Sequence, residues 1–113
     1  MKTRVYLCGP ISNIPDGNRP AFYAAEQQLE RLGYEVVNPH KLCANTVHEH
    51  VGTERELWLK CMKRDIPAML SCDVVALLPT WQASKGATLE RNLACALDIP
   101  VKYLDQLIPE SIV

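Results

Sequence analysis

An α/β domain built on a parallel sheet is the fold class that this sequence predicts, and two observations predict it. Short apolar runs with strand character alternate along the chain with longer segments whose apolar residues recur every three to four positions. This alternation is typical of right-handed crossover units, which place their strands in parallel. The nearly continuous apolar run of residues 73–79, DVVALLP, also suits a strand that is buried on both faces.

The first half of the chain contains two predicted strands and one helix. Residues 5–8, VYLC, are expected to form the first strand, and residues 34–39, YEVVNP, contain the second. Between them a helix is expected over residues 18–32. Asn18 is its predicted N-cap, and Gly33 follows its last residue, where glycine commonly ends a helix.

The second half begins with an expected polar loop over residues 40–53. A helix is predicted over residues 54–70, and Pro67 is expected to kink or end its last regular stretch. After the buried strand described above, a third helix is predicted over residues 87–97 and a last strand over residues 101–104. The C-terminal residues are expected to add at most one short helical turn.

With these elements the simplest topology is a flavodoxin-like (Rossmann-like) three-layer sandwich of four to five strands in the order 2-1-3-4(-5). Residues 1–113 have the size of a single domain with one core. In such sheets ligands bind beyond the carboxyl ends of the strands, where the strand order reverses. That point lies between strands one and three, so residues 9–18 and 79–90 are expected to border the site.

Composition excludes several classes of function. The chain is 48% hydrophobic and 22% charged with a net charge of -1, as in an ordinary globular protein. The absence of a Lys/Arg-rich run argues against general nucleic-acid binding. No apolar stretch is long enough to span a bilayer, and the N-terminal apolar segment is too short for a signal peptide. We therefore expect a cytoplasmic protein with neither nucleic-acid nor membrane partners.

The cysteines and histidines give little support for a metal site. The five cysteines form no C-x-x-C pair and suit small buried side chains in a reducing compartment. A set of His40, Cys43, His48 and His50 matches no standard zinc spacing, so a polar loop is the preferred interpretation. We expect no metal and no cofactor.

Glu90 is the first candidate for chemistry. If Gly86 opens the third helix, Glu90 lies in its first turn, where the helix dipole would keep the carboxylate ionised. A glutamate at a helix start is also a common stabiliser, and spacing alone favours that interpretation. Tyr6 brings a hydroxyl into a strand of core residues. Its hydroxyl either donates to a backbone group or donates to Glu90.

The remaining candidates surround the same expected edge of the sheet. Asp65 either projects over the strand ends or is an exposed acid paired with a Lys or Arg. Ser84, Lys85 and the amides at the start of the third helix make a plausible anion site. The candidate binding residues are Gly9, Pro10, Ser12, Asn13, Trp81, Ser84, Lys85 and Gly86.

Taken together, these residues resemble those of a known superfamily. The ordered motifs are Y-L-x-G-P-I-S, Asn18 with Phe22, G-Y-x-V-V-N-P, D-I-x-x-M-L-x-C-D-V-V-A-L-L-P-x-W and S-x-G-A-x-x-E. Over roughly residues 4–104 they are similar to the nucleoside 2-deoxyribosyltransferase superfamily. More narrowly, they resemble its branch of short phage and bacterial proteins without an assigned function, which is similar to the nucleoside 5'-monophosphate N-glycosidases.

The resemblance implies a flavodoxin-like fold and cleavage of an N-glycosidic bond, by hydrolysis or base transfer and without a cofactor. It implies that Glu90 is the nucleophile, that Tyr6 holds it, and that Asp65 is the acid near the base. Ser84 occupies a position where nucleotide hydrolases of the superfamily have Ser, whereas transferases acting on unphosphorylated nucleosides have Asp. The resemblance also implies a homodimer or higher homo-oligomer.

The Ser at this position has a physical meaning, because an Asp would repel a phosphate whereas a Ser donates a hydrogen bond to it. Ser84 and the amides near Gly86 are therefore expected to hold a 5'-phosphate, while Lys85 either adds positive potential or lies in solvent. Trp81 either stacks on the base or fills a subunit interface. Two other functions stay open: a nucleotide-binding or sensing module without turnover, and an interaction protein that uses Trp58 and Trp81.

Overall fold

A four-stranded parallel sheet forms the centre of the protein, as the sequence predicts. The computed structural model describes residues 2–12, 14–43 and 50–108. In this part of the chain the sheet has the order β2-β1-β3-β4, and every neighbouring pair of strands is parallel. The strands are β1 (Arg4–Cys8), β2 (Glu35–Val37), β3 (Val74–Leu77) and β4 (Val101–Tyr103).

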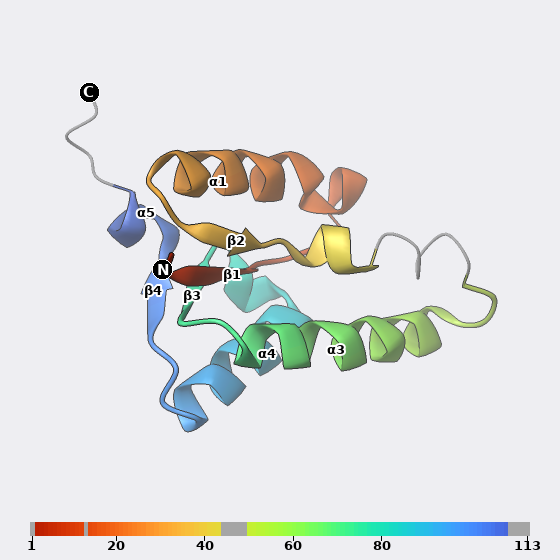
Figure 1. Ribbon diagram of the computed structural model, residues 1–113. Coiled ribbons are helices and arrows are strands. Elements are labelled where there is room, and N and C mark those ends of the chain that lie inside the picture. The colour runs from red at the N-terminus through yellow and green to blue at the C-terminus, as the bar shows by residue number, and fades with distance from the viewer. Residues whose placement is uncertain (1, 13, 44–49, 109–113) are drawn as a thin grey trace.

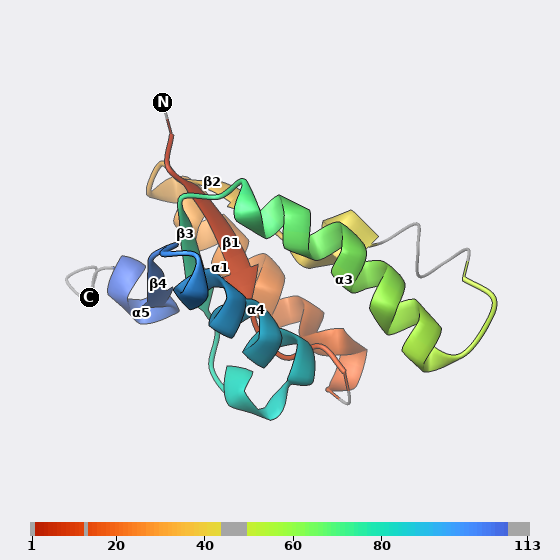
Figure 2. The ribbon, with the colours of Figure 1, turned by 90° about the horizontal axis from the view of Figure 1, so that it is seen from below.

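Helices cover both faces of the sheet and complete a flavodoxin-like three-layer sandwich (Figure 1). One face is covered by α1, and the opposite face by α3 and α4, which lie side by side in Figure 2. The helices are α1 (Arg19–Arg31), α3 (Glu54–Leu70), α4 (Lys85–Ala96) and the short α5 (Leu104–Leu107). Two 3-10 turns, Pro15–Asn18 and Trp81–Ala83, precede α1 and α4.

The alternation of side chains along β1 separates two hydrophobic cores. Val5 and Leu7 pack in the core beneath α1, whereas Tyr6 and Cys8 belong to the core shared with α3 and α4. All four side chains are fully buried. Because successive residues of a strand point to opposite faces, β1 delivers the Tyr6 hydroxyl to the α4 side of the sheet.

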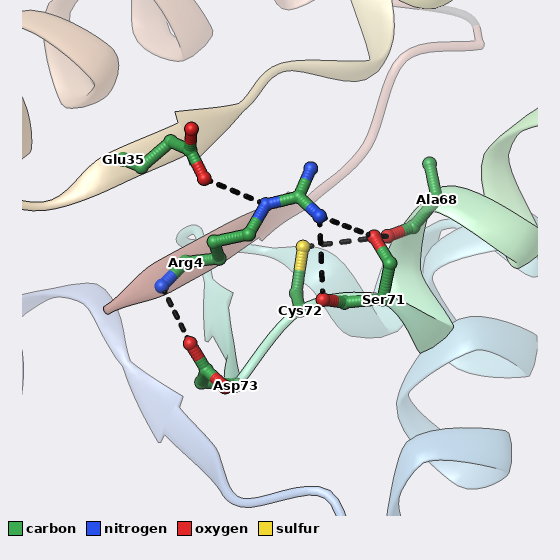
Figure 3. A network of polar contacts seen from close by, with 6 residues as sticks. All are labelled: Arg4, Glu35, Ala68, Ser71, Cys72 and Asp73. Atoms are coloured by element: carbon green, nitrogen blue, oxygen red, sulfur yellow. Dashed lines mark hydrogen bonds and ion pairs between the residues drawn. The ribbon is translucent and has the colours of Figure 1, made fainter. Parts of the chain in front are cut away.

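A polar network closes the amino end of the sheet (Figure 3). The Arg4 backbone amide donates to Asp73 Oδ2 at 2.8 Å, and Arg4 Nη1 donates to Ser71 Oγ at 2.8 Å. Arg4 Nε also lies 2.8 Å from Glu35 Oε2 in an ion pair. These contacts join β1 to β2 and to the segment between α3 and β3. They fix the end of the sheet opposite to the carboxyl ends of the strands.

The expected polar loop over residues 40–53 is wrong at its start, because residues 39–43 are helical and bury His40 and Cys43. An ion pair of 2.7 Å between Lys41 Nζ and Glu26 Oε2 ties this short helix to α1. Asn38 Nδ2 also donates to Glu26, to Oε1 at 3.4 Å. Tertiary burial therefore decides the conformation of a segment whose composition suggests a loop. Residues 44–49 lie outside the described residues.

The start of α1 follows the prediction in position but not in mechanism. Asn18 is the N-cap residue, yet its φ of 60° is left-handed and its side chain makes no capping hydrogen bond. Asp16 and Gly17 are also left-handed, with φ of 55° and 60°. The backbone of the preceding turn therefore sets the direction in which α1 leaves. Gly33, with a φ of 97°, follows the end of the helix as predicted.

The helices on the other face depart from the prediction at two points. Helix α3 has the predicted bounds and begins with a capping box between Thr53 and Glu56, but it continues through Pro67 to Leu70. Helix α4 begins at Lys85, two residues earlier than predicted, because the Ser84 side chain accepts a hydrogen bond from the Ala87 amide. This earlier start places Glu90 in the second turn of α4 instead of the predicted first turn.

We expect Pro67→Ala to stabilise the protein by about 1–2 kcal/mol, because an exposed proline inside a helix removes one backbone hydrogen bond. Urea denaturation followed by circular dichroism measures this difference. Lys63→Ala is the matched control, since Lys63 is exposed one turn earlier and exchanges one good helix former for another. A Pro67→Ala protein less stable than the wild type would contradict the expectation.

Candidate active site

A cavity of about 580 Å³ opens at the carboxyl ends of the strands, where the topology predicts a site. Five segments line it: the loop after β1, the start of α1, the helical residues 39–43, the inner face of α3, and the first half of α4 with Ser84 before it. A smaller hollow of about 390 Å³ beside β4 and α5 is mostly apolar. The larger cavity alone contains two buried carboxyl groups, so it is the candidate site of the described part of the chain.

Glu90 is one of these carboxyl groups, and Tyr6 holds it. The Tyr6 hydroxyl donates to Glu90 Oε2 at 2.6 Å, and the Glu90 side chain is only 5% exposed. This confirms the second of the two predicted partners for the Tyr6 hydroxyl. The prediction that the helix dipole keeps Glu90 ionised is wrong. Burial, assisted by the nearby charge of Asp65, raises the pKa of Glu90 to about 7, although the Tyr6 hydrogen bond opposes this rise.

Asp65 is the second carboxyl group, and it comes from α3. Its side chain is 6% exposed, and the Cys43 thiol donates to its Oδ1 over 3.3 Å. The alternative of an exposed acid paired with a Lys or Arg is therefore wrong. Burial raises the pKa of Asp65 to about 6, while the Cys43 hydrogen bond and the Arg64 charge act in the opposite direction. Asp65 projects into the same cavity as Glu90.

The two carboxyl groups have neighbouring pKa values, and the charge of Asp65 helps to raise that of Glu90. With pKa values of about 6 for Asp65 and about 7 for Glu90, the pair holds one proton on average between these two pH values. A cavity with one shared proton contains an acid and a base at once. Such an arrangement suits chemistry in which one carboxylate attacks and the other carboxyl group donates a proton.

Two glycines let the cavity form. A Cβ on Gly9 would lie 2.8 Å from the Leu78 Cβ, so the loop after β1 packs closer than any other residue permits. A Cβ on Gly86 would lie 3.3 Å from Trp58 Nε1, which keeps α4 close to α3. Both glycines line the cavity, as does Ser84, whose hydroxyl caps α4. These predicted binding residues are thus brought together.

Of the other predicted binding residues that the structure describes, Ser12 lines the cavity, whereas Pro10 and Trp81 do not. Ser12 is exposed, Pro10 is buried, and Trp81 packs against the core of the α4 side. The Trp81 ring lies 5.6 Å from the Arg91 guanidinium and is not part of the cavity lining. Asn13 lies outside the described residues. A base stacked on Trp81 within this cavity is therefore not supported.

Lys85, predicted as a possible cation of the anion site, is exposed and does not line the cavity. Its Nζ lies 4.7 Å from the centroid of the Trp58 ring, a cation–π distance. Among the described lining residues, Arg19 supplies the guanidinium that sequence reasoning missed. Arg19 directly follows residues 9–18, which the sequence predicts to border the site, so its position beside this segment was a usable signal.

Sequence reasoning also missed Trp58 and His40 as lining residues. Trp58 lies seven positions before Asp65, hence on the same helical face, and this spacing was a usable signal. His40 is 8% exposed, and its Nε2 lies 2.8 Å from the Gly17 carbonyl oxygen, to which a protonated Nε2 donates. Burial lowers the pKa of His40, which favours the neutral ring. This contact joins the cavity wall to the turn before α1.

A metal centre finds no support in the described part of the chain, where no three His, Cys, Asp or Glu side chains gather as ligands. His40 and Cys43 instead use their polar atoms for Gly17 and Asp65. His50 contacts the Thr53 carbonyl oxygen at 2.9 Å. His48, the remaining residue of the four considered as metal ligands from the sequence, lies outside the described residues.

The family model that matches this chain covers residues 3–103 and is described as a domain of unknown function, DUF4406. The chain belongs to the DUF4406 family. No curated protein matches the DUF4406 chain. Among its described residues, no helix has the length and apolar character needed to cross a membrane.

We expect Glu90→Gln to be more stable than the wild-type DUF4406 protein at pH 8. The pKa of Glu90 is about 7 in the fold against an ordinary value of 4.5, so the folded state binds more protons between these pH values. The free energy of unfolding therefore falls as the pH rises from 4.5 through 7, by roughly 3 kcal/mol for this group. Glu90→Gln lacks this loss, and urea denaturation at pH 4.5 and pH 8 measures it.

Glu30→Gln serves as the control for this measurement, because Glu30 is an exposed glutamate on α1. Its stability should follow the wild type at both pH values. If Glu90→Gln and the wild type lost equal stability between pH 4.5 and pH 8, Glu90 would titrate normally in the fold.

Proposed function

We propose that the DUF4406 chain cleaves the N-glycosidic bond of a nucleoside or deoxynucleoside 5'-monophosphate, with Glu90 as the nucleophile. The observation on which the proposal rests is the buried Glu90–Tyr6 hydrogen bond of 2.6 Å in a cavity that Asp65 also lines. The resemblance to the nucleoside 2-deoxyribosyltransferase superfamily supports the same roles for these three residues. It also supports assembly as a homodimer or larger homo-oligomer.

The first step forms a glycosyl ester on Glu90. Because Tyr6 holds Oε2, Oε1 is the oxygen that attacks C1' of the sugar. The C1'–N bond breaks as the C1'–O bond forms, through a transition state with oxocarbenium character. Asp65 transfers its proton to the departing base, which leaves neutral.

The second step returns the residues to their starting state. Water attacks C1' from the side that the base has left, and Asp65 accepts the proton that this water loses. The ester bond to Glu90 breaks, so the products are a free base and a sugar 5-phosphate. If another base attacks in place of water, the same intermediate yields base transfer.

The reactive form has Glu90 ionised and Asp65 protonated. Since the pKa of Glu90 lies about one unit above that of Asp65, this form is the minority arrangement of the singly protonated pair. Its population is greatest between pH 6 and pH 7. A bell-shaped dependence of kcat/KM on pH, with its maximum in that interval, follows from the pair.

Other groups that line the cavity suit a 5'-phosphate. Arg19, Ser12 and Ser84 line the cavity, and the first amides of α4 add the partial positive charge of a helix start. Arg19 provides charge-assisted hydrogen bonds to a phosphate, whereas an Asp at position 84 would repel it. These groups favour nucleotides over nucleosides as substrates.

Incubation of the purified protein with ribo- and deoxyribonucleoside 5'-monophosphates tests the proposal, with free base measured by chromatography. We expect base release by the wild type and a loss of at least about a thousandfold in Glu90→Gln, because the nucleophile is removed. Glu30→Gln, altered far from the cavity, should retain wild-type activity.

The absence of base release from every nucleotide would refute the proposal. A raised melting temperature with one of those nucleotides would then identify a binding or sensing module without turnover. If no nucleotide changed the melting temperature either, the interaction-protein alternative would remain.

A second prediction concerns the cation that recognises the phosphate. We expect Arg19→Gln to raise KM for the preferred monophosphate by about 10- to 100-fold, which corresponds to one lost charge-assisted contact. The KM for the corresponding nucleoside should not change. Lys85→Gln is the matched control, since Lys85 is exposed and lies over the Trp58 ring outside the cavity lining. A larger effect of Lys85→Gln than of Arg19→Gln would contradict the assignment.

A further inference from the structure

Cys43 occupies an unusual position in the cavity wall, because its thiol contacts an acid instead of packing as a small apolar group. Its Sγ lies 3.3 Å from Asp65 Oδ1 and 3.9 Å from the Cys61 carbonyl oxygen. The Cys43 side chain is only 7% exposed, and it comes from the helical residues 39–43, whereas Asp65 belongs to α3. The contact therefore joins two elements across the cavity.

In this contact the Cys43 thiol is the hydrogen-bond donor and the Asp65 carboxyl group is the acceptor. Burial, helped by the nearby Cys61 and Asp65, raises the pKa of the Cys43 thiol far above its ordinary value. This rise favours the protonated thiol, which can donate a hydrogen bond, over the thiolate. The Cys43 S–H group has two acceptors within reach, and the contact with Asp65 Oδ1 at 3.3 Å is shorter than that with the Cys61 carbonyl oxygen at 3.9 Å, which favours donation to Asp65.

Among the described residues, one of the two Asp65 carboxyl oxygens accepts a hydrogen bond. Cys43 donates to Oδ1, and among the described residues no group donates a hydrogen bond to Oδ2. When Asp65 takes up a proton, Oδ2 is the oxygen free to hold it, because Oδ1 already faces a donor. The thiol therefore distinguishes between two otherwise equivalent oxygens.

We infer that Cys43 is a positioning residue for the acid of the site: its S–H group holds Oδ1 of Asp65 and directs the protonated Oδ2 toward the cavity. This inference rests on the proposed function, in which Asp65 protonates the departing base. The matched pair of substitutions is Cys43→Ser, which keeps an O–H donor, and Cys43→Ala, which removes it.

The direction of the effect follows from electrostatics. The Cys43 hydrogen bond stabilises the carboxylate and lowers the pKa of Asp65, in opposition to burial, so its removal should raise that pKa above the present value of about 6. The other groups that act on Asp65 remain in both variants, so a change in its titration reports the thiol. Besides burial, the charge of Arg64 on α3 acts on Asp65. The charge of Asp65 in turn raises the pKa values of Glu90 on α4 and Tyr6 on β1, and Cys61 on α3 acts on the Cys43 thiol.

Infrared spectroscopy tests the contact without any assay of activity. The S–H stretching band of Cys43 is isolated as the difference between the wild type and Cys43→Ser. We expect this band to shift on Asp65→Asn and to change with pH as Asp65 ionises. A band that is insensitive to Asp65→Asn would overturn the inference.

The pH profile of kcat/KM then tests the consequence for the acid. We expect the acidic limb of Cys43→Ala to move to higher pH, and that of Cys43→Ser to stay near the wild type. Cys72→Ala is the control for loss of a buried thiol, because Cys72 is equally 7% exposed and donates to the Ala68 carbonyl oxygen instead. If Cys43→Ala and Cys72→Ala gave the wild-type profile, Cys43 would have no role in positioning.

The two measurements separate the inference from the proposed function. Failure of the wild type to release base from any nucleotide would overturn the proposed function, and the infrared band would still decide whether Cys43 holds Asp65. Turnover with an unshifted Cys43→Ala profile would overturn the inference alone.

Discussion

The burial of Glu90 against Tyr6 is the interaction on which the site depends. A carboxyl group that is 5% exposed costs free energy when it ionises, and the 2.6 Å hydrogen bond from a fully buried tyrosine offsets part of that cost. The pKa of Glu90 rises to about 7 because burial outweighs the hydrogen bond. Ionisable groups whose pKa is shifted by burial cluster at functional sites. The same burial makes Glu90 suitable for chemistry near neutral pH.

The sheet places this pair where a ligand can reach it. Tyr6 belongs to the face of β1 that packs against α3 and α4, while Val5 and Leu7 belong to the other core. Since β1 lies between β2 and β3, its carboxyl end is the point where the order of the strands reverses. The Arg4 network fixes the opposite end of the sheet, so the polar groups at the two ends have separate tasks (Figure 3).

The buried acids of the cavity and its arginine come from different helices. Asp65 and Glu90 come from the facing helices α3 and α4, and both have raised pKa values because burial disfavours their ionised forms. Arg19 reaches the cavity from the start of α1, next to the left-handed turn that His40 contacts. Lys85, nearer in sequence to Glu90, lies over Trp58 instead. Proximity in sequence to Glu90 is thus a poor guide to which cation lines the cavity.

The sequence by itself determined the strand order and the bounds of α3, because strand alternation and helical periodicity are local patterns. For the Tyr6 hydroxyl it left two partners open, and the tertiary structure selected Glu90, which is 84 positions away. Only the tertiary structure decided that residues 39–43 fold as a helix and that Cys43 meets Asp65, since both depend on burial between distant segments. It also decided the protonation of Glu90. A local pattern predicts a favourable helix dipole, whereas desolvation is a property of the whole fold.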